Sequence, residues 1–229
     1  MPALSAIQAT LSVPRIATYL SATHSDPPLH GAIELYAWNA QISAAFMHPL
    51  HLCEVVVRNA ISEALSAAYG KQWPWNNGFL LSLPSPAGRG AFNPRNAVLS
   101  ATAKAQISAN AGSNLSTDKA IAEMSFAFWE SMLTKRHDSG LWATHLLRLF
   151  PNTAADTPYF TVRAQIHSYL GTLRRLRNRI AHHEPIFARD LQAEFVMIDE
   201  LIRLRCRATA EWMLATQDVL RLLATKPPL

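Results

Sequence analysis

The chain has 229 residues, of which 49% are hydrophobic and 16% charged, and its formal net charge is +5. This length suits one large domain or two small ones, and the apolar content is ample for a buried core. We exclude a membrane-spanning helix because no apolar run reaches about 18 residues, and we expect no signal peptide because the N-terminus lacks a charged region followed by an apolar one.

Strand-like alternation is sustained nowhere along the chain, which predicts an all-α fold of about eight helices around one core. Residues 1–11 are expected to be a loose arm, residues 12–224 a single helical domain and residues 225–229 a tail. Pro49 is expected to end or kink the helix that contains the residues before it. Helices are predicted at residues 13–20, 29–47, 50–69, 94–110, 117–133, 141–150, 159–183 and 190–206, the last continuing or bending into 208–224. Thr117 and Asp190 are expected to cap the helices that follow them, and Gly70 is expected to end the helix at residues 50–69.

The two cysteines bear on the cellular compartment of the protein, and the arginines bear on its partners. Cys53 and Cys206 both lie in helical patterns and are expected to be reduced core residues of a cytoplasmic protein. Ten of the 21 basic residues lie between Arg163 and Arg221, and all ten are arginine. Arginine makes planar, bidentate contacts with phosphate, which favours nucleic acid as a partner. The alternative is that arginine is simply common in helices rich in Ala and Leu.

The helix predicted at residues 159–183 has a cation in the middle of its apolar stripe. The apolar members of the stripe are Ile166, Leu170, Leu173 and Ile180. Arg177 falls among them, where an apolar residue would be expected. A guanidinium cannot lose its charge, so its burial there needs a carboxylate or phosphate partner, or a wet cleft. Glu54 occupies the corresponding place in the helix predicted at residues 50–69.

Three polar groups lie along one flank of that stripe. Asn178 and His182 are four residues apart and therefore share a face of the helix, and Arg174 lies on the same side one turn earlier. Pro185 stops the helix shortly afterwards. The spacing thus predicts a cation, an amide and an imidazole along one edge of a helix, near its C-terminal end.

Residues 177–182, RNRIAH, match the R-x-x-x-x-H signature of the HEPN superfamily, and the longer string RNRIAHHEPIF resembles its bacterial Abi-like (abortive infection) branch. Two upstream blocks are similar to the same branch. They are residues 35–65, which include Glu54, Arg58 and Asn59, and residues 125–133, SFAFWESML. The three blocks occur in order, and the resemblance covers most of residues 12–205.

The resemblance implies a HEPN-type endoribonuclease that needs no metal ion and acts in phage defence as an abortive-infection or toxin-like effector. Such cleavage needs a base for the ribose 2′-OH proton, an acid for the leaving 5′-oxygen and a cation to neutralise the phosphorane. On this basis His182 is the general acid or base, Arg177 holds the phosphate and Asn178 orients it. Arg174 and Arg179 would follow the RNA backbone.

Further polar residues are predicted to support these groups. They are Glu54, Arg58, Asn59, His183 and Glu184. Glu54 is expected to reach the Arg177 region, directly or through a neighbour, because isolated burial of either charge would cost several kcal/mol. Arg58 is the competing partner of Glu54, since it lies four residues further along the same helix. His183 is interpreted as a support or packing residue, and Glu184 as a cap or a partner of an arginine.

We expect neither a cofactor nor a metal ion, because His182, His183 and Glu184 diverge as neighbours and no HExxH or CxxC pattern accompanies them. One chain carries one R-x-x-x-x-H whereas the chemistry needs two histidines, so the resemblance implies a symmetric homodimer. The expected partners are an RNA substrate, a second copy of the chain and a restraining RNA or protein antitoxin. A non-catalytic RNA-binding or assembly module is the first alternative, and a metal hydrolase is the second.

Overall fold

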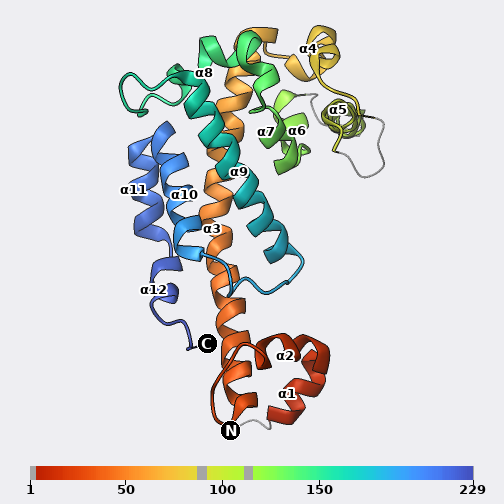
Figure 1. The fold of residues 1–229 in the computed structure, drawn as a ribbon. Helices are drawn as coiled ribbons and strands as arrows, with labels where there is room; N and C mark the ends of the chain where they lie inside the picture. The colour runs from red at the N-terminus through yellow and green to blue at the C-terminus, as the bar shows by residue number, and fades with distance from the viewer. Residues whose placement is uncertain (1–3, 87–91, 111–115, 229) are drawn as a thin grey trace.

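The computed structural model describes residues 4–86, 92–110 and 116–228, and within these ranges the chain is helical and contains no strand (Figure 1). This confirms the predicted all-α class, although the described ranges contain twelve α-helices and not about eight. The α-helices of the described ranges are α1 (Leu4–Leu11), α2 (Val13–Leu20), α3 (Pro28–Tyr69), α4 (Asn77–Ser82), α5 (Pro94–Asn110), α6 (Thr117–Ala122), α7 (Phe126–Ser131), α8 (Ala143–Leu149), α9 (Tyr159–Ala181), α10 (Leu191–Arg205), α11 (Arg207–Thr216) and α12 (Val219–Leu223).

Helix α3 is the axis of the fold, and α2, α9, α10 and α12 pack along its 42 residues (Figure 1). Pro49 lies buried inside this helix, which corrects the expectation of two separate helices. A proline inside a helix removes one backbone hydrogen bond, at a cost of about 3 kcal/mol. Phe46, Leu50 and Cys53, on either side of it, are buried in the core. Burial of apolar side chains on both sides of the proline offsets that cost and keeps the helix continuous.

The buried apolar side chains form one cluster that runs from Ile16 to Leu222. Its largest fully buried members include Trp73, Trp129 and Trp142. The tail expected after residue 224 is tied to this core, because Lys226 Nζ donates a hydrogen bond to the carbonyl of Phe187 at 2.8 Å. The described helices thus pack around a single core, from α2 to α12.

Several predicted boundaries agree with the structure. Helix α2 spans the predicted residues, and Gly70 ends α3 with a φ of 88°, a value that glycine adopts without strain. Asp190 caps α10, since its Oδ1 accepts a hydrogen bond from the amide of Ala193 at 3.0 Å. These boundaries follow from local chemistry that tertiary packing did not override.

Two predicted segments differ from the structure. Residues 4–11, expected to be part of a loose arm, form α1, which packs on α2 and α3. The helix predicted at residues 117–133 is divided into α6 and α7, because Ser125 adopts an extended backbone between them. Ser116, and not Thr117, caps α6 by accepting a hydrogen bond from the amide of Lys119.

Within the described ranges, no helix combines the length and the apolar character needed to cross a bilayer.

Candidate functional site

Helix α9 ends two residues earlier than predicted, and the two adjacent histidines follow its last turn. His182 is the C-cap residue, and His183 has a φ of 55°, in the left-handed region. The amide of His183 donates to the carbonyl of Ile180 at 3.0 Å, and the amide of Glu184 donates to the carbonyl of Arg179 at 2.8 Å. This pair of bonds is the Schellman arrangement, in which glycine usually occupies the position that His183 holds.

A histidine in the left-handed region costs about 1–2 kcal/mol relative to a right-handed residue. The surrounding contacts hold it there. Arg15 Nη1, from α2, donates to the carbonyl of His183 at 2.9 Å. Arg179 Nε and Nη2 donate to the carbonyl of Pro185 at 3.1 and 2.9 Å. Strained residues that the rest of the structure maintains often belong to functional sites, which makes His183 a candidate in its own right.

Arg177 and Asn178 lie near the end of α9, and His182 directly follows its last residue. Arg177 and His182 are exposed and Asn178 is half-buried, and within the described residues no side-chain hydrogen bond or ion pair engages any of the three. The exposure of Arg177 corrects the prediction that it is buried in the apolar stripe. Leu176 and Ile180 are buried in this part of the helix. The buried face near the C-terminal end of α9 therefore does not include Arg177.

The two other arginines of the segment are already engaged. Arg174 Nε forms an ion pair with Glu130 Oε2 from α7, and a Cβ at Gly171 would lie only 3.1 Å from the other oxygen of that carboxylate. Arg179 faces Glu184 at 3.5 Å in addition to its bonds with Pro185. Glu184 is thus the partner of an arginine, as predicted. Both guanidinium groups remain partly exposed, so each can also face a ligand.

Glu54 does not make the predicted contact with the motif. It is half-buried, and no hydrogen bond or ion pair within the described residues joins it to Arg58 or to residues 177–182. Arg58 is also half-buried, and its Nε is enclosed without a hydrogen-bond partner. Asn59 is exposed. Glu54 and Arg58 lie on a partly exposed face of α3, so the predicted need to neutralise a fully buried charge does not arise there.

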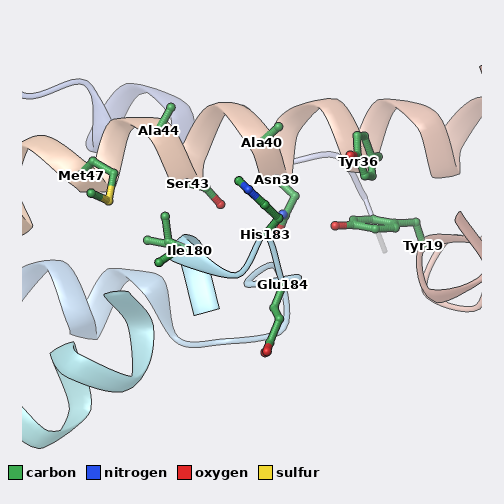
Figure 2. A pocket seen from close by; sticks show the side chains of 11 residues that line it. Tyr19, Tyr36, Asn39, Ala40, Ser43, Ala44, Met47, Ile180, His183 and Glu184 are labelled. Atoms are coloured by element: carbon green, nitrogen blue, oxygen red, sulfur yellow. The ribbon is translucent and has the colours of Figure 1, made fainter. Parts of the chain in front are cut away.

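A cavity of about 410 Å³ lies between α3, the end of α9 and the end of α2. Its polar lining includes Tyr19, Tyr36, Asn39 and His183. Figure 2 shows the His183 ring directed toward α3, whereas Glu184 points away from it. Burial, and to a lesser extent the neighbouring Tyr36, raises the pKa of Tyr19 to about 12. The phenol of Tyr19 is therefore a neutral donor and acceptor at physiological pH.

Asn39 is the residue of this cavity that sequence reasoning missed. Its carbonyl oxygen accepts hydrogen bonds from the amides of Ile186 and Phe187, at 2.8 and 3.1 Å, and so holds the turn after α9 against α3. A sequence signal exists, because Asn39 is a lone amide within the buried face that Leu35 and Ile42 form. The partner segment lies 147 residues away in sequence, which no local pattern reveals.

Within the described ranges, no group of three His, Cys, Asp or Glu side chains is placed to hold a metal ion.

Comparison with protein-family models, with curated proteins and with solved structures finds no match to this chain. The chemistry of the site therefore rests on its own geometry. An exposed guanidinium, an amide and an exposed imidazole lie at one end of a helix, beside a cavity with aromatic and hydrogen-bonding walls. Such a set can bind an anion, and an imidazole can exchange a proton near neutral pH.

Proposed function

We propose that this chain is a metal-independent endoribonuclease of the HEPN type, related to the Abi-like proteins. The observation that carries the proposal is the availability of Arg177 and His182. Both are exposed at the end of α9, five residues apart, and neither side chain has an intramolecular partner in the described part of the chain. A guanidinium without a partner can hold a phosphate, and an exposed imidazole beside it can take up or release a proton.

In the proposed reaction a ribose 2′-oxygen attacks the adjacent phosphorus and the 5′-oxygen leaves. One imidazole takes the 2′-OH proton, and a second imidazole gives a proton to the leaving oxygen. Arg177 neutralises the charge that develops on the phosphorane, and Asn178 orients the phosphate. The products are a 2′,3′-cyclic phosphate and a 5′-OH, so no water and no metal ion enters the cleavage step.

The reaction needs two imidazoles, whereas each chain supplies one through its R-x-x-x-x-H. We therefore propose a symmetric homodimer in which the ends of the two α9 helices face each other across the twofold axis. Sedimentation velocity of the active protein tests this. A species of one chain that still cleaves RNA would contradict the composite site.

The decisive experiment is incubation of total RNA with the wild type and with His182→Ala, in EDTA, followed by mapping of the ends. We expect cleavage by the wild type alone, with 2′,3′-cyclic phosphate and 5′-OH ends. Cleavage that stops in EDTA or yields 5′-phosphate ends would exclude this mechanism, since those outcomes belong to metal-activated water.

The biological role proposed is that of a cytoplasmic abortive-infection or toxin-like effector held in check by an RNA or protein antitoxin. Unrestrained expression should then slow growth, and Arg177→Ala should remove that effect. A non-catalytic RNA-binding or assembly module remains the second candidate, because one chain presents a single imidazole at the motif. RNA binding without cleavage by the purified dimer would favour it.

A further inference from the structure

The cavity beside α9 is built to hold a flat polar ligand. Its volume of about 410 Å³ lies within the range of roughly 300–1,000 Å³ that is typical of small-molecule sites. Ala40, Ala44, Met47 and Ile180 supply apolar walls. The rings of Tyr19 and Tyr36 lie together at one end of the cavity, 5.1 Å apart in an edge-to-face arrangement (Figure 2).

Asn39 gives the cavity a fixed hydrogen-bond donor. Only 6% of this residue is exposed, and its carbonyl oxygen faces the amides of Ile186 and Phe187. Those two N–H groups fix the orientation of the side-chain amide, because only its oxygen can accept from them. The nitrogen must then point the other way, and it has no hydrogen-bond partner within the described residues. Protein atoms do not enclose this nitrogen, so a ligand in the cavity can reach it.

A donor that is held in a fixed orientation by a buried side chain, is accessible from a cavity and makes no hydrogen bond to the protein suits a ligand with an acceptor at that place. The oxygen of Asn39 has both lone pairs engaged, so the amide can donate to a ligand but cannot accept from one. A ligand that presents a carbonyl oxygen to Asn39 accepts a hydrogen bond from its amide nitrogen. A ligand that presents an amino group instead places one donor against another and forms no hydrogen bond.

We propose that this cavity binds a base of a single-stranded RNA, with the Asn39 N–H facing the exocyclic group at position 4 of a pyrimidine or position 6 of a purine. Uracil and guanine carry an oxygen there and are preferred, whereas cytosine and adenine carry an amino group there and are disfavoured. The proposal rests on the proposed function, because the cavity is lined by Ala181 and His183, the two neighbours of His182. An RNA strand whose phosphate lies at Arg177 and His182 can place an adjoining base in it. Unstacked bases commonly rest on tyrosine and histidine rings while a few donors and acceptors read their edges.

His183 supplies one wall of the cavity. Figure 2 shows its ring crossing from the turn after α9 toward α3, beside Asn39. A glycine at this position would relieve the backbone but would leave that side of the cavity open. The imidazole therefore contributes to the cavity what a glycine could not.

The test is binding of 2′-O-methyl hexanucleotides, measured by fluorescence anisotropy. These probes lack the attacking 2′-OH, so binding is measured whether or not the protein cleaves RNA. The wild type should bind the uridine hexamer roughly three- to tenfold more tightly than the cytidine hexamer, which is the worth of about one hydrogen bond. A guanosine placed in the cytidine hexamer should give a similar gain over an adenosine placed there.

Two variants remove the site without removing the fold. Asn39→Asp keeps an oxygen for the two backbone amides and replaces only the donor, and Ala40→Phe fills the cavity from an exposed position. Both should abolish the preference for uridine. Gln41→Glu and Ala37→Phe are the matched controls, because both positions are exposed on α3 and do not line the cavity. Both controls should keep the preference.

Equal binding of the two hexamers by the wild type, or an unchanged preference in Asn39→Asp and Ala40→Phe, overturns the proposal. A preference that depends on Asn39, in a protein that leaves unmodified RNA intact, would support the base site and overturn the nuclease. Cleavage of RNA with no base preference would support the nuclease and overturn the base site.

Discussion

Helix α9 carries one arginine near its start, Arg163, and another near its end, Arg177, and the two have opposite surroundings. A histidine belongs to each region: His137 precedes Asp138, the ion-pair partner of Arg163, and His182 follows the last residue of α9. Near its start, Arg163 and His137 are each only 8% exposed. At its end, Arg177 and His182 are both exposed. The same residue types are thus buried at one end and exposed at the other. Burial and partners, not residue identity, separate a structural arginine from one that a ligand can use.

Specific contacts hold the buried Arg163 in place. Arg163 Nη1 donates to the carbonyl of Leu133 at 3.0 Å, and Arg163 Nε lies 2.7 Å from Asp138 Oδ1. The second contact is short but is not aligned as a hydrogen bond; the guanidinium donates to the other oxygen of Asp138 instead, from Nη2 to Oδ2 at 3.4 Å. Burial, and next the charge of Arg136, lowers the pKa of His137 to about 4, against the opposing effect of Asp138. His137 is therefore neutral at pH 7.

The largest effect expected is on activity, at the exposed pair. His182→Ala should lower the rate of RNA cleavage by about 10²- to 10⁴-fold, which is the usual contribution of a general acid or base. The thermal midpoint should stay unchanged, because His182 is exposed. His145→Ala, on α8 at the other end of the molecule, is the control and should cleave like the wild type. A normal rate in His182→Ala would remove His182 from the chemistry.

The next effect is on stability, at the buried pair. Arg163→Ala leaves the carboxylate of Asp138 without its cation and should lower the free energy of unfolding by about 3–5 kcal/mol. Urea unfolding measures it. The double variant with Asp138→Ala should lose less than the sum of the two single variants, because the stranded charge is gone. Additive losses would show that the ion pair contributes nothing.

The buried histidine predicts a pH dependence of stability. His137 has a pKa of about 4 in the folded state and about 6.5 when unfolded, so the unfolded chain binds more protons between these values. Its contribution is fully present above pH 6.5 and is lost as the pH falls toward 4. The loss between pH 7 and pH 5 should be about 2 kcal/mol. His137→Gln should remove this part of the urea-unfolding pH profile, and an unchanged profile would contradict the assignment.

A smaller effect is expected at the turn between the exposed arginine and the cavity. His183→Gly should raise the free energy of unfolding by roughly 0.5–1 kcal/mol, since relief of the left-handed strain exceeds the added freedom of the unfolded chain. His183→Ala keeps the strained backbone and is the control. If both substitutions lower the stability equally, the imidazole contacts outweigh the strain.

The sequence predicted what local chemistry determines. Asp190 as a cap and Gly70 as a stop are both found. It failed where distant packing decides. Pro49 does not break α3, because the core on both sides of it holds the helix together. The rule that an arginine in an apolar stripe needs a partner was sound, but it applies to Arg163, whose partner is a carboxylate, and not to Arg177. Which arginine is buried depends on neighbours from other parts of the chain, and the periodicity of one helix gives no information about them.

The smallest effect on stability is expected for Arg177→Ala, and it gives the sharpest comparison with Arg163→Ala. Arg177 is exposed and has no partner within the described residues, so its removal should change the free energy of unfolding by less than about 0.5 kcal/mol. Its effect on RNA should be clear all the same. Loss of one phosphate contact should reduce the slope of log K against log salt by about 0.7 for a single strand. Arg163→Ala, measured at a temperature where it is folded, should keep the wild-type slope. Equal slopes for wild type and Arg177→Ala would mean that the exposed end of α9 does not hold the phosphate, and that the free arginine belongs to some other contact.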